Sequence, residues 1–273
     1  MTTAIEDAKA KAETTYNAAA DRYDDAANSF WERFGRATVE RLGLSKGATV
    51  LDVCCGSGAS ALPAAEIVGF SGRVLGIDLA ERMLENARYK ARSRGLGNVT
   101  FKTGDMLHLH TSEHFDAVVC VFGIFFVPDI EAAARSLWNR VRPGGKLAVT
   151  TWGPRWLEPA TSFFWESIRN ERPDLYKGFN PWDRICDPES LDAVLKGAGI
   201  EGAEIVAEAN HHPIQTPDAW WSAVLGTGYR GTVEQLDEAA FERVRKANLD
   251  YIRDTKLRAV EANVVYAIAS KPR

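Results

Sequence analysis

The chain has 273 residues, of which 45% are hydrophobic and 26% are charged, and its formal net charge is -4 at pH 7. This composition is ordinary for a globular protein, and the length allows one large core. The slightly acidic balance argues against a nucleic-acid partner. The polar N-terminus is unlike a signal peptide, and no apolar run reaches the roughly 18 residues that span a membrane. We therefore expect a cytoplasmic protein without integral membrane contact.

Hydrophobic periodicity predicts alternating helices and strands along the chain. The predicted helices cover residues 21–42, 60–68, 81–94, 130–141 and 188–197. The first predicted strand begins at Val50, and the others cover 73–77, 99–103, 115–124, 141–152, 203–208 and 264–269. Because such alternation places helices on both faces of a mostly parallel sheet, we expect a doubly wound α/β fold.

A glycine-rich loop follows the first predicted strand, in the sequence VLDVCCGSGASA that starts at Val50. A GxGxxA turn of this kind brings backbone amides close to a ligand at a helix N-terminus, so it predicts a nucleotide-like cofactor. Asp78 and Asp105 follow the next two predicted strands and would lie at the same sheet edge. A carboxylate there can accept hydrogen bonds from ribose hydroxyls or from an exocyclic amine.

In this order, the segments resemble the class I methyltransferases that depend on S-adenosylmethionine (SAM), particularly the small-molecule branch that includes quinone C-methyltransferases. The resemblance is strong over residues 18–152. It implies a Rossmann-like sheet of seven strands and SAM as the cofactor. Asp52 and residues 56–58 would hold the methionine end, Asp78 the ribose, and Asp105 with Met106 the adenine. The full set of implied cofactor residues is Asp52, Cys54, Gly56, Ser57, Gly58, Asp78, Leu79, Met83, Gly104, Asp105, Met106, Cys120 and Phe122. Cys54 departs from the small residue that many relatives carry, although a compact thiol should fit.

Two other classes with glycine-rich loops are less compatible with the sequence. A nicotinamide dehydrogenase would often need a YxxxK pair, and no tyrosine here has a lysine four residues later. Asp52 would also repel a pyrophosphate, whereas it suits a ligand that carries an ammonium group. Enzymes that methylate base amines usually carry an Asn-Pro-Pro-Tyr type motif after the fourth strand, where this chain reads CVFGIFFVPD.

The remaining segments are rich in aromatic residues and predict a cap over the cofactor. We expect one domain over 1–273, with a core of about 40–152, 187–210 and 259–273 and a cap from 1–39, 153–186 and 211–258. The acceptor-binding candidates are Tyr16, Tyr23, Trp31, Trp152, Trp182 and Arg230. Tyr16 and Tyr23 would share a helix face. So many aromatic residues favour an apolar or aromatic acceptor, with an aromatic cage for an amine as the alternative.

His211 and His212 are the principal candidates for a general base, because they begin the second insertion. Tyr229 is a third catalytic candidate, and with Arg230 it could hold a carboxylate or phenolate. His108, His110 and His114 are weaker candidates. The four cysteines read as free thiols, and we expect no metal.

We therefore expect methyl transfer from SAM to oxygen or carbon of a small, lipophilic or aromatic acceptor, by a monomer or homodimer without a nucleic-acid partner. N-methylation of an amine and a non-catalytic SAM-binding regulator remain alternatives.

Overall fold

The computed structural model describes residues 2–109, 111 and 113–273, and His110 lies outside this part of the chain. Seven strands form one sheet in the order β3-β2-β1-β4-β5-β9-β6. They are β1 (Thr49–Val53), β2 (Arg73–Asp78), β3 (Val99–Thr103), β4 (Phe115–Val121), β5 (Val141–Trp152), β6 (Glu204–Glu208) and β9 (Val264–Ser270). The strands are parallel except that β9 runs antiparallel to both β5 and β6. The predicted doubly wound, mostly parallel sheet is confirmed.

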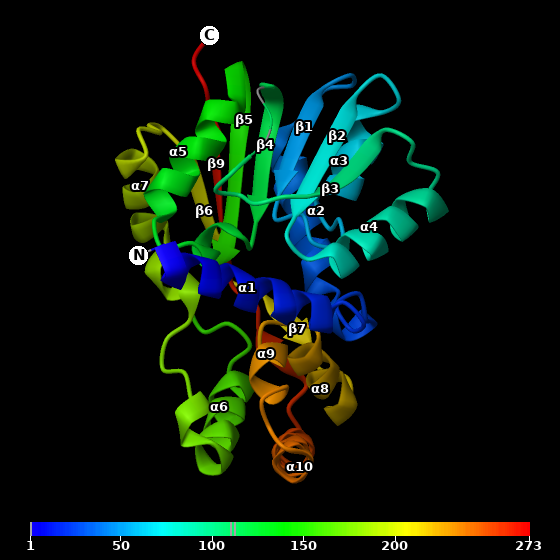
Figure 1. Ribbon diagram of the computed structural model, residues 1–273, viewed down its shortest axis with the longest axis vertical. Helices are drawn as coiled ribbons and strands as arrows, with labels where there is room; N and C mark the ends of the chain where they lie inside the picture. Colours follow the sequence, from blue (N-terminus) through cyan, green and yellow to red (C-terminus); the bar gives the residue numbers. More distant parts are fainter. Residues whose placement is uncertain (1, 110, 112) are drawn as a thin grey trace.

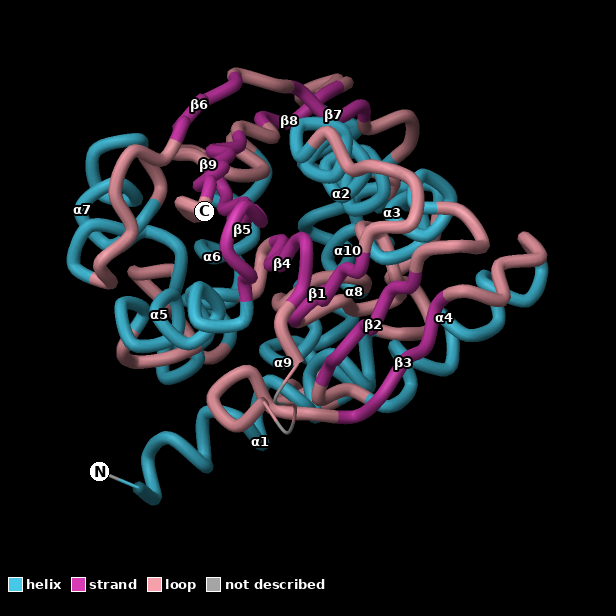
Figure 2. The backbone as a smooth tube through the Cα atoms, turned by 90° about the horizontal axis from the view of Figure 1, so that it is seen from above, coloured by secondary structure: helices cyan, strands magenta, loops and turns pink. Residues whose placement is uncertain are grey.

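Helices cover both faces of this sheet. On one face lie α2 (Phe30–Leu42), α3 (Ala61–Val68) and α4 (Glu81–Ser93), and on the other lie α5 (Ile130–Arg140) and α7 (Pro188–Gly197) (Figure 2). The predicted helices agree closely with α3, α4, α5 and α7. Strand β4 ends at Val121 rather than at residue 124, because Phe122 adopts a left-handed backbone conformation with φ of 53° and turns the chain.

The predicted single helix over 21–42 is wrong. The chain instead forms α1 (Thr2–Ala19), a turn, a short 3-10 helix η1 (Ala26–Asn28), and then α2. Short polar side chains in the interruption bond to distant groups: Asp24 accepts from Ser57, Asp25 from Ser222, and Asn28 donates to two carbonyls. Such bonds compete with helix formation. Tyr16 and Tyr23 therefore lie on different segments, although their ring centroids are still 6.4 Å apart.

Helix α1 crosses the carboxyl ends of the parallel strands, and most of the two insertions lies beyond it (Figure 1). The first insertion forms α6 (Ala160–Glu171), η3 (Pro173–Leu175) and η4 (Pro181–Ile185). The second forms β7 (His211–Pro213), α8 (Pro217–Leu225), α9 (Arg230–Val233) and α10 (Glu238–Asp254). Strand β7 pairs with β8 (Ala259–Glu261) in a separate two-stranded sheet, which was not predicted because three-residue strands carry no clear periodicity.

None of the helices in the described residues is long and apolar enough to cross a membrane.

Candidate functional site

The glycine-rich loop turns sharply between β1 and α3. Cys54, Gly56 and Gly58 have φ values of 59°, 51° and 88°. Glycine adopts this left-handed region without strain, whereas a side chain disfavours it. At Gly56 a Cβ atom would lie 3.3 Å from the Met83 Cε and 3.5 Å from the Tyr23 hydroxyl. The loop therefore brings bare backbone to a crowded position at the sheet edge, as the sequence predicted.

Asp78 joins this loop to the end of β2. One carboxylate oxygen accepts the backbone N–H of Gly56 at 2.8 Å, and the other accepts that of Ala80 at 2.9 Å. Burial raises the pKa of the Asp78 carboxyl, although these backbone bonds oppose the shift. These two hydrogen bonds fix the Asp78 side chain beside the glycine loop, at the end of β2.

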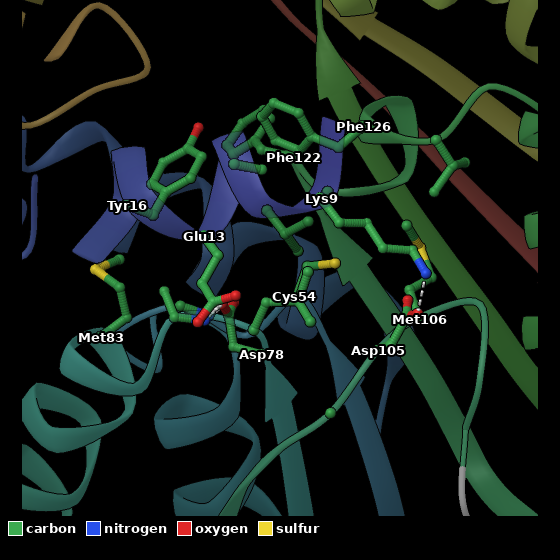
Figure 3. Close-up of a pocket in the computed structure, with 18 of the residues that line it drawn as sticks. Lys9, Glu13, Tyr16, Cys54, Asp78, Met83, Asp105, Met106, Phe122 and Phe126 are labelled. Carbon is green, nitrogen blue, oxygen red and sulfur yellow. Dashed lines mark hydrogen bonds and ion pairs between the residues drawn. The ribbon is translucent and has the colours of Figure 1, made fainter. Parts of the chain in front are cut away.

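A cavity of about 100 Å³ lies at these strand ends, and we call it the strand-tip cavity. Nine of the thirteen predicted cofactor residues line it: Cys54, Gly56, Asp78, Leu79, Met83, Gly104, Asp105, Met106 and Phe122. Figure 3 shows several of them with residues of α1 above. From the predicted acceptor-binding set, Tyr16, Tyr23 and Trp31 also reach it.

Helix α1 closes this cavity with residues that sequence reasoning missed, among them Lys9 and Glu13. The Lys9 ammonium lies 2.6 Å from the Asp105 carboxylate, which also contacts His108 Nδ1 at 2.9 Å. Desolvation alone would raise the pKa of Asp105, but the hydrogen bonds with Lys9 and His108 outweigh it and leave that pKa lowered. No motif marks Lys9, because its role depends on how α1 docks.

The other four predicted cofactor residues, Asp52, Ser57, Gly58 and Cys120, do not line the strand-tip cavity. Asp52 is 1% exposed, and its carboxylate accepts a 2.6 Å hydrogen bond from Ser60 at the start of α3. Burial raises the pKa of Asp52 to about 7. Ser57 donates to Asp24, and Gly58 and Cys120 do not reach the cavity either. Asp52 and Ser57 thus tie the loop to neighbouring segments instead of lining the space that it encloses.

A second cavity of about 470 Å³ adjoins the first, and we call it the aromatic cavity. Tyr16, Trp31 and Phe122 line both cavities, so the two spaces meet at these rings. The predicted residues Trp152, Trp182 and Tyr229 line the aromatic cavity together with Phe125, Phe126, Trp156, Trp165 and Phe179. Its volume lies within the roughly 300–1,000 Å³ typical of small-molecule sites.

The charged residues that line the aromatic cavity are Lys11, Lys177 and Arg184. Within the described part of the chain, no Asp or Glu lines it. Arg184 donates to the backbone carbonyls of Phe125 and Val127 at 2.8 and 2.9 Å, which ties η4 to the loop after β4. The cavity is therefore apolar over most of its wall and positive in its charged part.

Tyr229 lies deep in the aromatic cavity. It is 4% exposed, and its hydroxyl is 3.0 Å from that of Thr161. Burial raises the pKa of the Tyr229 phenol above its ordinary value, so the group stays protonated at neutral pH. It can donate a hydrogen bond but is a poor base.

The two histidines predicted as bases do not line either cavity. His212 is 3% exposed, donates from Nε2 to the Ala27 carbonyl at 2.8 Å, and packs edge-on against Phe30. Burial lowers the pKa of His212, which keeps the ring neutral. His211 is exposed, and so is His114. Arg230 also lies outside both cavities. It forms a 2.6 Å salt bridge with Glu234.

Among the described residues, no group of three or more His, Cys, Asp or Glu side chains could hold a metal ion. The four cysteines are free.

Comparisons with known proteins agree with the fold described above. Residues 50–145 match the methyltransferase domain family. Demethylmenaquinone methyltransferase from Geobacillus sp. (strain WCH70) is 36% identical over 111 residues, which cover 40% of this chain and 47% of that protein. The protein of the same name from Lactobacillus johnsonii is 33% identical over 140 residues, or 50% of this chain and 57% of that one. The chain thus spans about half the length of the curated relatives it matches.

A solved structure extends the likeness beyond the matched segment. The YcgJ protein from Bacillus subtilis aligns with a TM-score of 0.57 and 16% identity, covering 88% of this chain and 99% of that one. At this identity the likeness establishes the fold alone. Together these matches confirm the predicted resemblance to class I methyltransferases.

Proposed function

We propose that this chain, which has the class I methyltransferase fold, binds SAM and transfers its methyl group to oxygen or carbon of a small aromatic acceptor. One observation carries the proposal: a cavity lined by the glycine loop and two strand-tip carboxylates opens beside an aromatic cavity of small-molecule size. Tyr16, Trp31 and Phe122 lie where the two spaces meet. Two ligands bound in these spaces would have their nearest atoms at these rings.

The residues of the strand-tip cavity fit a nucleoside that carries an amino acid. Asp78 can accept from ribose hydroxyls, and Asp105 with Met106 can receive the adenine. Asp52 is separated from the cavity by the loop, so we propose that it supports the loop, and that a bound ammonium nearby would favour its ionised form. When bound, SAM supplies a methyl carbon that its sulfonium has already activated.

The chemistry left to the protein is mainly positioning. Holding the two reactants in line can contribute roughly 7–11 kcal/mol in favourable cases. The stacked pair Phe122 and Trp152, whose ring centroids are 3.7 Å apart, forms a rigid wall at the junction. We propose that this wall, with Trp31, orients the acceptor and excludes water.

The charges of the aromatic cavity favour an oxygen or carbon acceptor over an amine. Lys11, Lys177 and Arg184 would repel an ammonium ion, and no described carboxylate lines the cavity to attract one. The same cations favour the ionised form of a phenol or enol, so such an acceptor needs less help from a general base. The indole N–H groups of Trp31 and Trp156 are buried without a hydrogen-bond partner among the described residues, which favours a ligand that carries acceptor oxygens.

We further propose that residues 1–273 act as one unit, as a monomer or homodimer in the cytoplasm, on a small molecule rather than on nucleic acid. Helix α1 lines both cavities, the two insertions supply part of the aromatic cavity, and the strand ends with their loops supply the rest of both. A non-catalytic regulator that only binds SAM is the remaining alternative. The size of the aromatic cavity argues against it, because a regulator needs no space for an acceptor.

The test is transfer of a labelled methyl group from SAM into a small-molecule extract of the source cells. We expect label in an organic-extractable product with the wild type and at least about tenfold less with Asp78→Asn. Asp192→Asn, on α7 and outside both cavities, removes only an ion pair with Lys196, so it is the matched control and should transfer normally. Tight binding of S-adenosylhomocysteine without any transfer would favour the regulator.

The pH dependence separates the two kinds of acceptor. A phenol or enol beside fixed cations should be methylated with little change above neutral pH, because it is already ionised. An amine would instead react faster as rising pH removes its proton. A rate that climbs steadily to pH 10 would therefore overturn the preference for oxygen or carbon.

A further inference from the structure

Two lysines from distant segments face the same aromatic cavity. Lys11 comes from α1, and Lys177 from the loop between η3 and η4. Neither ammonium group makes a hydrogen bond or an ion pair with another side chain or carbonyl in the part of the chain that the structure describes. Loss of hydration lowers the pKa of Lys177, and the positive charge of Lys11 lowers it further. The two lysines are both exposed, and they line the same cavity, which no described Asp or Glu lines.

The face of α1 explains why Lys11 reaches this cavity while its neighbour Lys9 does not. Lys9 and Glu13 line the strand-tip cavity, whereas Lys11 and Thr15 line the aromatic cavity. Each pair is spaced by four residues and so lies on one helix face. Lys9 is neutralised by Asp105 at 2.6 Å. Lys11 forms no salt bridge among the described residues, although Asp7 lies one turn earlier on the same helix face, and no described Asp or Glu lines the cavity that Lys11 reaches.

We propose that Lys11 and Lys177 bind an anionic group, such as a carboxylate, carried by an aromatic acceptor whose ring lies among the tryptophans. This inference rests on the proposed function and names the class of its substrate. The bound anion would relieve the repulsion between the two ammonium groups and would form charge-assisted hydrogen bonds with both. The acceptor is then an acidic aromatic compound rather than a neutral lipophilic one.

The surroundings of Lys177 fit an amphipathic ligand of this kind. Its ammonium lies 5.6 Å from the ring centroid of Trp165, which also lines the cavity. Phe179, two residues further on, is 56% exposed and lines the same cavity. Charged and aromatic groups therefore occur side by side, while the deeper wall around Trp152 and Tyr229 is buried. A ligand with an apolar ring and an ionised end matches both parts.

The experiment measures binding by quenching of tryptophan fluorescence, since five tryptophans line the cavity. The probes are 2-naphthoate and its neutral analogue 2-naphthamide, added to protein saturated with S-adenosylhomocysteine. We expect the wild type to bind naphthoate at least about tenfold more tightly than naphthamide, a difference that corresponds to 1.4 kcal/mol. The double variant Lys11→Gln/Lys177→Gln should bind the two probes about equally. The conservative variant Lys177→Arg should retain most of the preference.

The matched control is Lys246→Gln on α10, whose side chain is 79% exposed and outside both cavities. It should keep the preference of the wild type. A wild type that binds both probes equally, or neither, would overturn the inference, and so would a double variant that keeps the preference for naphthoate. Failure of S-adenosylhomocysteine itself to bind would instead count against the proposed function, so the two outcomes are distinguishable.

Discussion

Asp52 shows how a residue can match a cofactor pattern and still act from behind the loop. It is 1% exposed, and one of its oxygens bonds Ser60 while the other has no partner among the described residues. Its burial raises the pKa from 3.8 to about 7. Between these two pH values the folded protein holds a proton that the unfolded chain has released. The free energy of unfolding should therefore fall as the pH rises through this range and stay lower above it.

We predict that Asp52→Asn removes this fall, because an amide does not titrate. Relative to the wild type, the variant should gain up to about 4 kcal/mol of unfolding free energy between pH 4 and pH 8. Chemical denaturation at four or five pH values measures the difference directly. A difference between the two proteins that stays constant with pH would show that Asp52 is ionised throughout.

His212 is the second residue whose role changes once its surroundings are known. We predict that His212→Ala lowers the unfolding free energy by about 1–3 kcal/mol, because it removes the hydrogen bond to Ala27 and the contact with Phe30. Methyl transfer per folded molecule should persist, since the ring reaches neither cavity. His212→Gln can still donate a hydrogen bond and should recover part of the stability. Loss of transfer at unchanged stability would restore the histidine as a candidate base.

At the scale of elements, α1 is the helix most closely coupled to the site. It lines both cavities, and the strand-tip cavity beneath it holds only about 100 Å³, well below the roughly 300 Å³ of the smallest usual ligand sites. We infer that α1 shifts outward to admit a nucleoside and settles over it afterwards. Because it rests on a cavity rather than on a packed core, its amides should exchange faster than those of α2.

Hydrogen exchange tests this role of α1. We predict that the amides of residues 9–19 exchange more slowly when S-adenosylhomocysteine is bound, by about tenfold or more, since the ligand fills the space beneath the helix. Helix α10 lines neither cavity and supplies the internal control. Unchanged exchange in α1 at a saturating ligand concentration would contradict the account.

The elements also show what the sequence can predict. The strands of the sheet and the carboxylates Asp78 and Asp105 at their ends followed from periodicity and order, because these features are local. Most of α1 was missed because TTAIEDAKAKAETTYNAA is polar around most of its circumference. The direction of the Asp52 side chain and the presence of Lys11 and Lys177 at one cavity depend on tertiary packing, which no local pattern records.

In the whole molecule, the sheet lies on one side of α1 and most of the two insertions on the other (Figure 1). The sheet provides the glycine loop and the strand-tip carboxylates, and the insertions with α1 complete an aromatic cavity to which Phe122 and Trp152 also contribute. The match to the methyltransferase domain family covers residues 50–145. The parts that would select the acceptor lie mostly outside that segment. Specificity is therefore best determined from this chain's own cavity rather than from its relatives.

The measurement that tests the central claim most directly is a calorimetric titration of S-adenosylhomocysteine into the wild type, Asp78→Asn and Asp192→Asn. We predict one site per chain in the wild type, binding weakened by at least about tenfold in Asp78→Asn, and unchanged affinity in Asp192→Asn. Circular dichroism would verify that each variant is folded. No saturable binding to the folded wild type, or equal affinity in wild type and Asp78→Asn, would contradict the assignment of the strand-tip cavity as the cofactor site.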